Sequence, residues 1–350
     1  MEERPEGDGG KAPVQRERIA LFDNVKGLLI ILVVFGHIAH PVHNSNPVLS
    51  ALFDIIYLFH MPLFVLVSGL FAKGAYRDGK LNVNRIISFA VLGFAFQLAL
   101  ALVNGAVLTP QRILAFTSAP WYLISMAAWY AMTPILTRLG AARGLAASLA
   151  IALCWGAVDL SNGFLAISRT MAFLPCFALG YYLRPATVAG LRARKGLWLA
   201  VGAAALTTGA RAIDPEAFAW FFPMVYGDNP YELGFIEGVA QKLTALAVGG
   251  VFSLAVLKLV PMRRSRLTAL GQRTMQVYVL HRLIRAWLTF HTPLYDLPIM
   301  NDPILGTAIV LAMTAAVTAL CAAPIFEAPF ARALGIRWTP DRKRTAVARN

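Results

Sequence analysis

Long apolar blocks alternate with short polar connections over most of the chain. The blocks run for about 15–25 residues, the length that an α-helix needs to cross the hydrocarbon core of a bilayer. The pattern predicts an all-α fold, a polytopic transmembrane helical bundle with about ten spans. The predicted spans cover residues 22–41, 48–72, 86–108, 121–138, 144–160, 169–183, 196–210, 238–259, 274–290 and 304–324.

The composition agrees with a membrane protein. Hydrophobic residues make up 58% of the 350 residues and charged residues 14%, which is too apolar for an ordinary soluble domain. The net charge of +14 comes from basic residues that cluster in alternate connections. Cytoplasmic loops of membrane proteins have this distribution, so the charge indicates topology and no nucleic-acid partner. Both termini are therefore expected in the cytoplasm, in a multi-pass protein whose partner is the lipid bilayer of the cell membrane.

The chain divides into one membrane domain and two tails. Residues 1–17 are rich in Glu, Gly, Pro and Arg without apolar periodicity, which predicts a disordered cytoplasmic tail. Residues 18–330 form the predicted membrane domain, and residues 331–350 a basic cytoplasmic tail.

Two histidines interrupt apolar blocks. Ten uncharged residues separate Lys26 from His37, which places the imidazole roughly 16 Å of helix beyond the lysine. His60 lies in the next block. An ionisable group at such a depth indicates a functional site, although a lone histidine can also hydrogen-bond a neighbouring helix. His40 and His43 continue the spacing of three, but Pro41 disturbs the helix between them and the sequence predicts no metal site.

Four motifs occur in a fixed order along the chain, with the Lys26–His37 spacing before the first of them. They are Phe59-His60-Met61-Pro62-Leu63-Phe64 with Ser68-Gly69, Pro120-Trp121-Tyr122-Leu123, Phe173-Leu174-Pro175 with Gly180-Tyr181, and Thr274-x-x-Val277-Tyr278-x-x-His281. Together the motifs and the spacing resemble the integral-membrane acyltransferases of acyltransferase family three, which include O-antigen, nodulation-factor and fucose O-acetylases. The similarity spans about residues 18–330.

The resemblance implies transfer of an acyl group from acyl-coenzyme A to a hydroxyl group. Acetyl-coenzyme A is the expected donor, and a sugar, a glycan such as a polysaccharide, or an exported metabolite is the expected acceptor. Such a reaction needs a base beside the hydroxyl and a donor of positive charge beside the developing oxyanion. We assign the base to His37, and Lys26, Arg85 or Arg169 to positioning the donor or stabilising charge. His60 either contacts substrate or satisfies backbone groups that Pro62 leaves free.

Three basic residues between the second and third predicted spans are candidates for binding the coenzyme. Family members carry Arg-x-x-Arg near this position, and this chain has Arg77-x-x-Lys80, followed by Arg85. Lys80 lacks the guanidinium group that binds an anion through two hydrogen bonds. Whether Arg77 and Lys80 have the role of the family's two arginines is therefore open. Topology alone also accounts for cations here.

Four residues are candidates for binding the acceptor. Trp121 opens the fourth predicted span in a family motif. Arg169 is one of three basic residues in the loops of the outer side, with Arg112 and Arg211, and its candidate partners are an acceptor hydroxyl, an oxyanion or Asp159. The outer connection at 211–237 combines acids and aromatic residues, which suit a glycan or simply an interfacial belt.

His281 and Arg285 lie one helical turn apart in the ninth predicted span, next to Arg282. Two arginines in an apolar block require an anionic partner unless they extend to the interface. The candidates are a phosphate or carboxylate of a ligand, or an acid of the chain, namely Asp54, Asp159 or Glu327.

Two other functions remain open at this stage. A secondary transporter or lipid-linked sugar flippase would use buried histidines and arginines as a proton relay and a substrate site. A transporter often carries an internal repeat, and the motif around His60 has no counterpart in the second half. A catalytically silent family member could act as a membrane sensor or scaffold.

Overall fold

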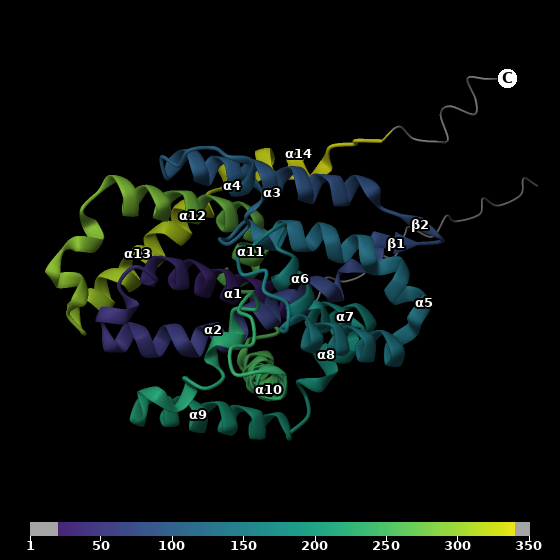
Figure 1. Ribbon diagram of the computed structural model, residues 1–350, viewed down its shortest axis with the longest axis horizontal. Helices are drawn as coiled ribbons and strands as arrows, with labels where there is room; N and C mark the ends of the chain where they lie inside the picture. Colours follow the sequence, from purple (N-terminus) through teal and green to yellow (C-terminus); the bar gives the residue numbers. More distant parts are fainter. Residues whose placement is uncertain (1–19, 340–350) are drawn as a thin grey trace, which may run out of the picture.

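The structure is a computed structural model that describes residues 20–339 (Figure 1). Within this range the regular structure is almost entirely helical, as expected. The α-helices are α1 (Ala20–Ala39), α2 (Pro47–Leu70), α3 (Val83–Val103), α4 (Pro110–Leu114), α5 (Trp121–Trp155), α6 (Ile167–Ala172), α7 (Leu174–Tyr182), α8 (Pro185–Leu191), α9 (Leu197–Ile213), α10 (Phe235–Leu259), α11 (Arg266–Gln272), α12 (Thr274–His291), α13 (Leu305–Cys321) and α14 (Glu327–Gly335).

Short elements join these helices. The described residues contain one sheet, in which β1 (Tyr76–Arg77) pairs antiparallel with β2 (Lys80–Leu81). The 3-10 helices are η1 (His43–Ser45), η2 (Ala72–Ala75), η3 (Pro215–Phe218), η4 (Phe222–Val225), η5 (Leu294–Asp296), η6 (Pro298–Asn301) and η7 (Pro324–Phe326).

The predicted tails fall largely outside the described residues. Residues 1–17 and 340–350 are not described. The first part of the carboxyl-terminal segment lies on α3, because Trp338 donates from Nε1 to Ser88 Oγ at 3.0 Å and Arg85 Nη1 donates to Leu334 O at 3.3 Å. The proposed domain boundaries stay a prediction.

Helix α1 is the central helix. In its most apolar window 72% of the residues are buried, against 28% in α3, and Figure 1 shows α1 between α3 and α9. It packs against α2, α11, α12 and α13. Asn24 in its first turns is fully buried and bonds the segment before α11, donating to Pro261 O and Arg263 O at 2.8 Å and accepting from Thr268 Oγ1 at 2.6 Å. A polar side chain therefore holds the start of α1.

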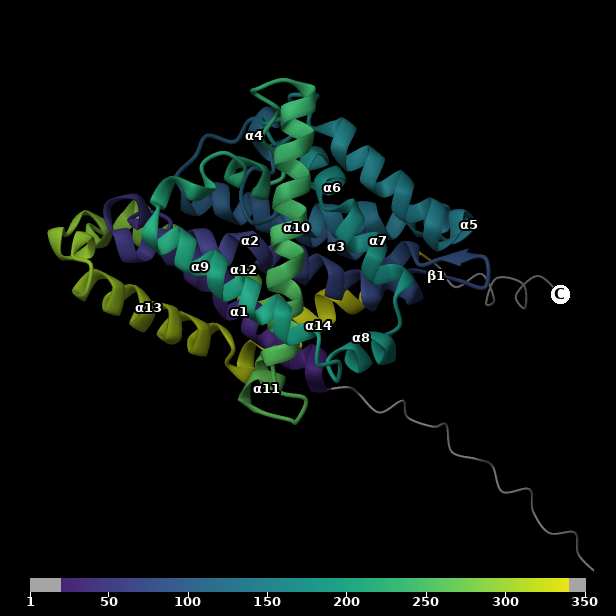
Figure 2. The same ribbon diagram turned by 90° about the horizontal axis from the view of Figure 1, so that it is seen from below.

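Among residues 20–339, five helices are long and apolar enough to cross a membrane, or six if α13 and the segment Pro324–Gly335, bent by 52°, form one span. The predicted fourth and fifth spans belong to α5, which has a non-helical residue at Gly140 (φ 73°, ψ 174°). The predicted sixth span is broken at Phe173 into α6 and α7. Helix α10 packs against α2 and α9. It is seen along its axis in Figure 1 and lengthwise in Figure 2, at a steep angle to the helices behind it.

Glycines allow α2 and α7 to approach closely. A Cβ atom at Gly180 would lie 1.9 Å from the Leu66 carbonyl oxygen, and one at Gly69 would lie 2.1 Å from the Phe177 carbonyl oxygen. Both obstacles are backbone atoms of the facing helix, which cannot rotate away. This crossing fixes α2, which carries His60, against the segment that follows Arg169.

We expect Gly180→Ala to destabilise the fold by about 1–3 kcal/mol, because the added methyl group must push α2 and α7 apart. Thermal unfolding of the purified protein in detergent measures the effect. Gly209→Ala is the matched control, since a Cβ atom there meets nothing within 4 Å and alanine favours the helix. Equal melting temperatures for Gly180→Ala and wild type would contradict the close crossing.

Candidate active site

Six of the predicted site residues line or adjoin one cavity of about 300 Å³, which we call the histidine cavity. His37 and His60 line it from α1 and α2, Trp121 from α5, Arg169 from α6 and Arg285 from α12. His281 adjoins it through its bond to His37. Residues from the whole length of the chain therefore meet at one place. The other lining residues are Val33, His40, Tyr57, Met61, Thr117, Ser118, Ala119, Phe173, Val225, Tyr226, Tyr278 and Arg282.

A hydrogen bond of 2.8 Å joins His37 Nδ1 to His281 Nε2. His281 Nδ1 lies 2.7 Å from Val277 O. A carbonyl oxygen only accepts, so Nδ1 of His281 carries the hydrogen and its Nε2, when the ring is neutral, accepts from His37 Nδ1. Nε2 of neutral His37 is then left without a proton. No hydrogen bond to this nitrogen occurs within residues 20–339, so His37 can act as a base toward the cavity.

Arg285 supports the same histidine from the backbone side. Its Nε donates to the carbonyl oxygen of His37 at 3.2 Å, near the end of α1, where carbonyl groups lose their helical partners. Because Arg285 and His281 lie on the same face of α12, one helix holds both the ring and the backbone of His37. Arg282 projects from the same helix and donates from Nε to Ser118 Oγ at 3.2 Å.

His60 bonds its own helix. Its Nδ1 lies 2.8 Å from Ile56 O, one turn earlier, so Nδ1 donates and Nε2 is left as an acceptor. Pro62 frees the carbonyl of Leu58, not that of Ile56, and Gly249 of α10 packs against this freed group. His60 therefore does not satisfy the carbonyl that Pro62 releases, and its contact with substrate stays a prediction.

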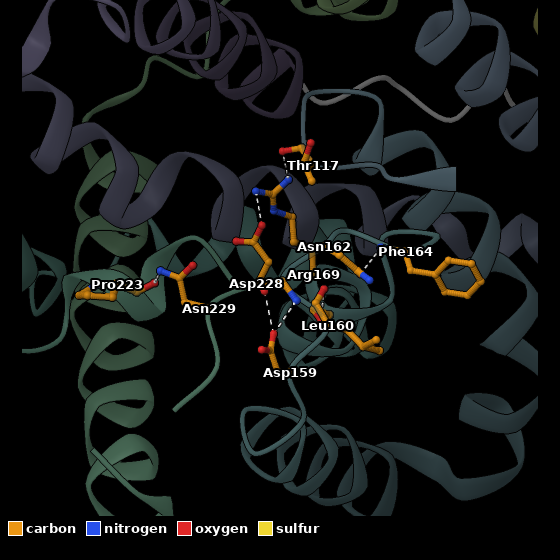
Figure 3. A network of polar contacts seen from close by, with 11 residues as sticks. Thr117, Asp159, Leu160, Asn162, Phe164, Arg169, Pro223, Asp228 and Asn229 are labelled. Carbon is orange, nitrogen blue, oxygen red and sulfur yellow. Dashed lines mark hydrogen bonds and ion pairs between the residues drawn. The ribbon is translucent and has the colours of Figure 1, made fainter. Parts of the chain in front are cut away.

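Arg169 is held by an acid that the sequence did not single out. Its Nη2 forms an ion pair with Asp228 Oδ2 at 2.5 Å, and its Nη1 donates to Thr117 O at 2.8 Å (Figure 3). Asp159, one of the three candidate partners, does not pair with Arg169: the arginine pairs with Asp228, and the Asp159 carboxylate accepts from Ser161 Oγ at 2.7 Å. Burial raises the pKa of Asp228 above its ordinary value, an effect that the nearby Arg169 opposes.

Backbone geometry explains this choice of partner. Leu165 and Ala166 both have positive φ, of 46° and 54°, so the chain turns sharply before α6. Such conformations cost on the order of 1–3 kcal/mol for residues other than glycine, and they cluster at functional sites. The turn is held by Phe116 N, which donates to Gly163 O at 2.8 Å. It places Arg169 next to the 211–237 connection, where Asp228 lies.

A second cavity of about 200 Å³, the lysine cavity, adjoins the histidine cavity. Lys26 and Arg85 supply its cations among aromatic and apolar side chains. Lys26 Nζ is paired with Asp23 at 2.8 Å, and the Arg85 guanidinium lies 5.1 Å from the Phe89 ring centre. The residues that line both cavities are Val33, Met61 and Tyr278.

Arg77 and Lys80 lie in neither cavity. They face each other across the β1–β2 hairpin, and the Arg77 side chain is 82% exposed. The structure therefore separates these two cations from Arg85, with which the sequence grouped them.

The acids expected for Arg282 and Arg285 are occupied elsewhere. Asp54 pairs with Arg211 at 2.7 Å, and Glu327 lies 3.2 Å from Arg273. Asp159 bonds Ser161, as described above. The alternative that one of these three acids pairs with Arg282 or Arg285 is therefore wrong.

Three residues at the site were given no role from the sequence. Tyr278 lines both cavities, and its position three residues before His281 was the available signal. Ser118 and Asp228 lie in connections with no periodicity, so only the folded chain places them here. No group of three or more potential ligands among residues 20–339 could hold a metal ion, and His43 Nδ1 donates to His40 O at 2.8 Å.

The fold and the site together define a helical protein with several helices able to cross a membrane and a histidine pair inside it. The sequence model of family three, described as an acyltransferase domain, matches residues 19–323. The chain therefore belongs to acyltransferase family three.

Two curated proteins are similar to part of the chain. Nodulation protein NolL of Sinorhizobium fredii (strain NBRC 101917 / NGR234) is 54% identical over 56 residues, and nodulation protein NolL of Mesorhizobium japonicum (strain LMG 29417 / CECT 9101 / MAFF 303099) is 44% identical over 57 residues. Each match covers 15% of this chain and 15% of the relative. No solved structure matches the chain.

The Arg169–Asp228 pair should show strong energetic coupling. We expect the single changes Arg169→Gln and Asp228→Asn each to destabilise the protein by about 1.5–3 kcal/mol, because each leaves a largely buried charge without its partner. The double variant should lose less than the sum of both. Thermal unfolding of the four proteins measures the coupling, and additive losses would contradict it.

Proposed function

We propose that the protein is a membrane O-acyltransferase that transfers an acyl group, in the first place acetyl, from acyl-coenzyme A to a hydroxyl group of a glycan or exported metabolite. The observation that carries the proposal is the bond between His37 and His281 in a chain of this family. It leaves Nε2 of His37 free to take the proton of the attacking hydroxyl.

The reaction divides between the two cavities. The donor enters the lysine cavity, where Lys26 and Arg85 attract its phosphates and the apolar wall accepts the acyl chain. The acceptor enters the histidine cavity. The thioester carbon then lies near the common boundary of Val33, Met61 and Tyr278, within reach of a hydroxyl group beside His37.

Proton transfer follows from the tautomers. Nε2 of His37 takes the hydroxyl proton as the oxygen attacks the thioester carbon, and the resulting imidazolium is stabilised because His281 Nε2 accepts from its Nδ1–H. When the tetrahedral intermediate collapses, the C–S bond breaks and His37 returns the proton to the thiolate. His281 is a positioning residue in this scheme. His60 Nε2 and Trp121 contact the acceptor.

The exposed cations serve the distal part of the donor. Arg77 and Lys80 follow the end of α2 that lines the lysine cavity, so they are available to the phosphates of coenzyme A at the membrane surface. The chain crosses the cell membrane about ten times in this proposal, with both termini in the cytoplasm. The family membership favours acyl transfer over transport.

Replacing His37 by glutamine should lower acyl transfer by about 10²–10⁴-fold, because glutamine keeps a polar side chain but cannot accept the proton. Membranes incubated with radiolabelled acetyl-coenzyme A and a panel of glycans measure the transfer. His43→Gln is the matched control, since His43 hydrogen-bonds the His40 carbonyl, stacks on Phe53 and lines neither cavity. Unchanged transfer by His37→Gln would remove the assignment of the base.

The topology has its own test. Reporter domains fused at Gly79, in the β1–β2 hairpin, and at Gly227, in the connection before α10, should report opposite sides of the membrane, with Gly79 in the cytoplasm. A reporter pair of an enzyme active only in the cytoplasm and one active only outside gives the readout. Both positions on one side would rule out the proposed arrangement.

A further inference from the structure

The histidine cavity contains two arginines, Arg282 and Arg285, that form no ion pair with any acid among residues 20–339. Arg282 and Arg285 are only 9% and 8% exposed, and both line the cavity. Their hydrogen-bond acceptors are the neutral Ser118 hydroxyl and His37 carbonyl. Nη1 of Arg282 is buried and has no hydrogen-bond partner in the part of the chain that the structure describes. The cavity therefore holds two adjacent positive charges with unused donors.

Such an arrangement is costly without a ligand. A buried ion without a counter-charge costs several kcal/mol, and a buried donor without an acceptor adds to that cost. Two guanidinium groups one turn apart on α12 also repel each other. An oxyanion bound between them removes both costs, because a guanidinium group presents a fork that matches carboxylate and phosphate oxygens.

The third arginine of the cavity behaves differently. Arg169 is neutralised by Asp228 and also lies 5.5 Å from the Trp121 ring centre, so its charge and donors are used within the fold. The charges available to a ligand are thus those of Arg282 and Arg285. Since Arg285 also bonds the carbonyl of His37, a ligand held by this pair lies beside the proposed base.

We propose that the acceptor carries an oxyanion, the carboxylate of a uronic acid or a phosphate ester, and that Arg282 and Arg285 bind this group while a hydroxyl group of the same molecule faces His37. That the ligand is the acceptor of acyl transfer rests on the proposed function, whereas the binding of an oxyanion rests on the cavity alone. A volume of about 300 Å³ fits one sugar unit and its charged group.

The donor does not account for the arginine pair. Lys26 and Arg85 lie in the lysine cavity, and the wall of Val33, Met61 and Tyr278 separates that cavity from the histidine cavity. In the proposed function, Lys26 and Arg85 bind the phosphates of coenzyme A within the lysine cavity. Neutralising Arg282 and Arg285 is therefore left to the molecule that enters the histidine cavity.

Binding to the purified full-length protein tests the inference without turnover. Methyl β-glucuronide, glucose 6-phosphate and the neutral methyl β-glucoside are titrated by calorimetry in detergent, with coenzyme A as a fourth ligand. We expect at least one charged sugar to bind roughly tenfold or more tightly than the neutral one, because a buried charge-assisted pair contributes at least that much. The carboxylate and phosphate arms identify the oxyanion.

Variants locate the binding site. Arg282→Gln and Arg285→Lys should each weaken the charged sugar by roughly tenfold or more and leave coenzyme A unchanged. Arg285→Lys keeps the charge, so it tests the forked geometry if Arg282→Gln does not fold. Arg112→Gln, at an exposed arginine of an outer loop, is the matched control and should bind as wild type does.

The outcomes separate this inference from the proposed function. Equal binding of charged and neutral sugars, or a loss of coenzyme A binding in Arg282→Gln, overturns the anionic acceptor, whatever the acyl transfer assay shows. Binding of a charged sugar that depends on both arginines supports it, even if no acyl transfer to any glycan occurs, in which case the proposed function fails and the ligand remains.

Discussion

The hydrogen bond between His37 and His281 is the interaction on which the site depends. It joins residues 244 positions apart, one near the end of the central helix α1 and one in the middle of α12. The His281 ring is fully buried and the His37 ring is half-buried at the edge of the cavity, so each ring needs a polar partner inside the protein. Because the backbone of α12 fixes the hydrogen of His281 on Nδ1, the direction of the whole chain of bonds follows from one carbonyl group, that of Val277.

The packing around this bond explains how broken and short elements build the site. Helix α1 is fixed at its start by the buried Asn24 and near its end by Arg285, so His37 has little freedom to move. The glycines at the α2–α7 crossing bring α2 against the segment that follows Arg169. The strained turn at Leu165 and Ala166 then orients Arg169 toward Asp228. Asn24, the glycines and the turn lie outside the cavity, and each sets the position of a residue inside it.

Much of the site could be predicted from the sequence. Hydropathy separated the apolar blocks. The motifs and spacing gave His37, His60 and Trp121 as candidates, the unusual placement of cations gave Arg169 and Arg285, and all five line one cavity. The partners of the arginines could not be predicted. Arg169 pairs with Asp228 and not Asp159 because of the turn at Leu165 and Ala166, which have positive φ although neither is glycine. The pattern of apolar residues does not predict such a turn. The pairing of Asp54 with Arg211 and of Glu327 with Arg273 also depends on tertiary contacts, which the sequence pattern does not predict.

Hydropathy also predicts only part of the structure of α5. The pattern placed a boundary between two spans near Gly140, and the backbone does leave the helix there, but whether the two halves cross the membrane separately depends on tilt, which hydropathy does not encode.

The three side chains shared by the histidine cavity and the lysine cavity have a further consequence. In the proposed function the donor and the acceptor enter different cavities, and Val33, Met61 and Tyr278, which line both, lie between them. These three side chains must then meet two opposing demands. They have to part enough for an acyl group to pass and still keep protons and small ions from leaking down the membrane potential.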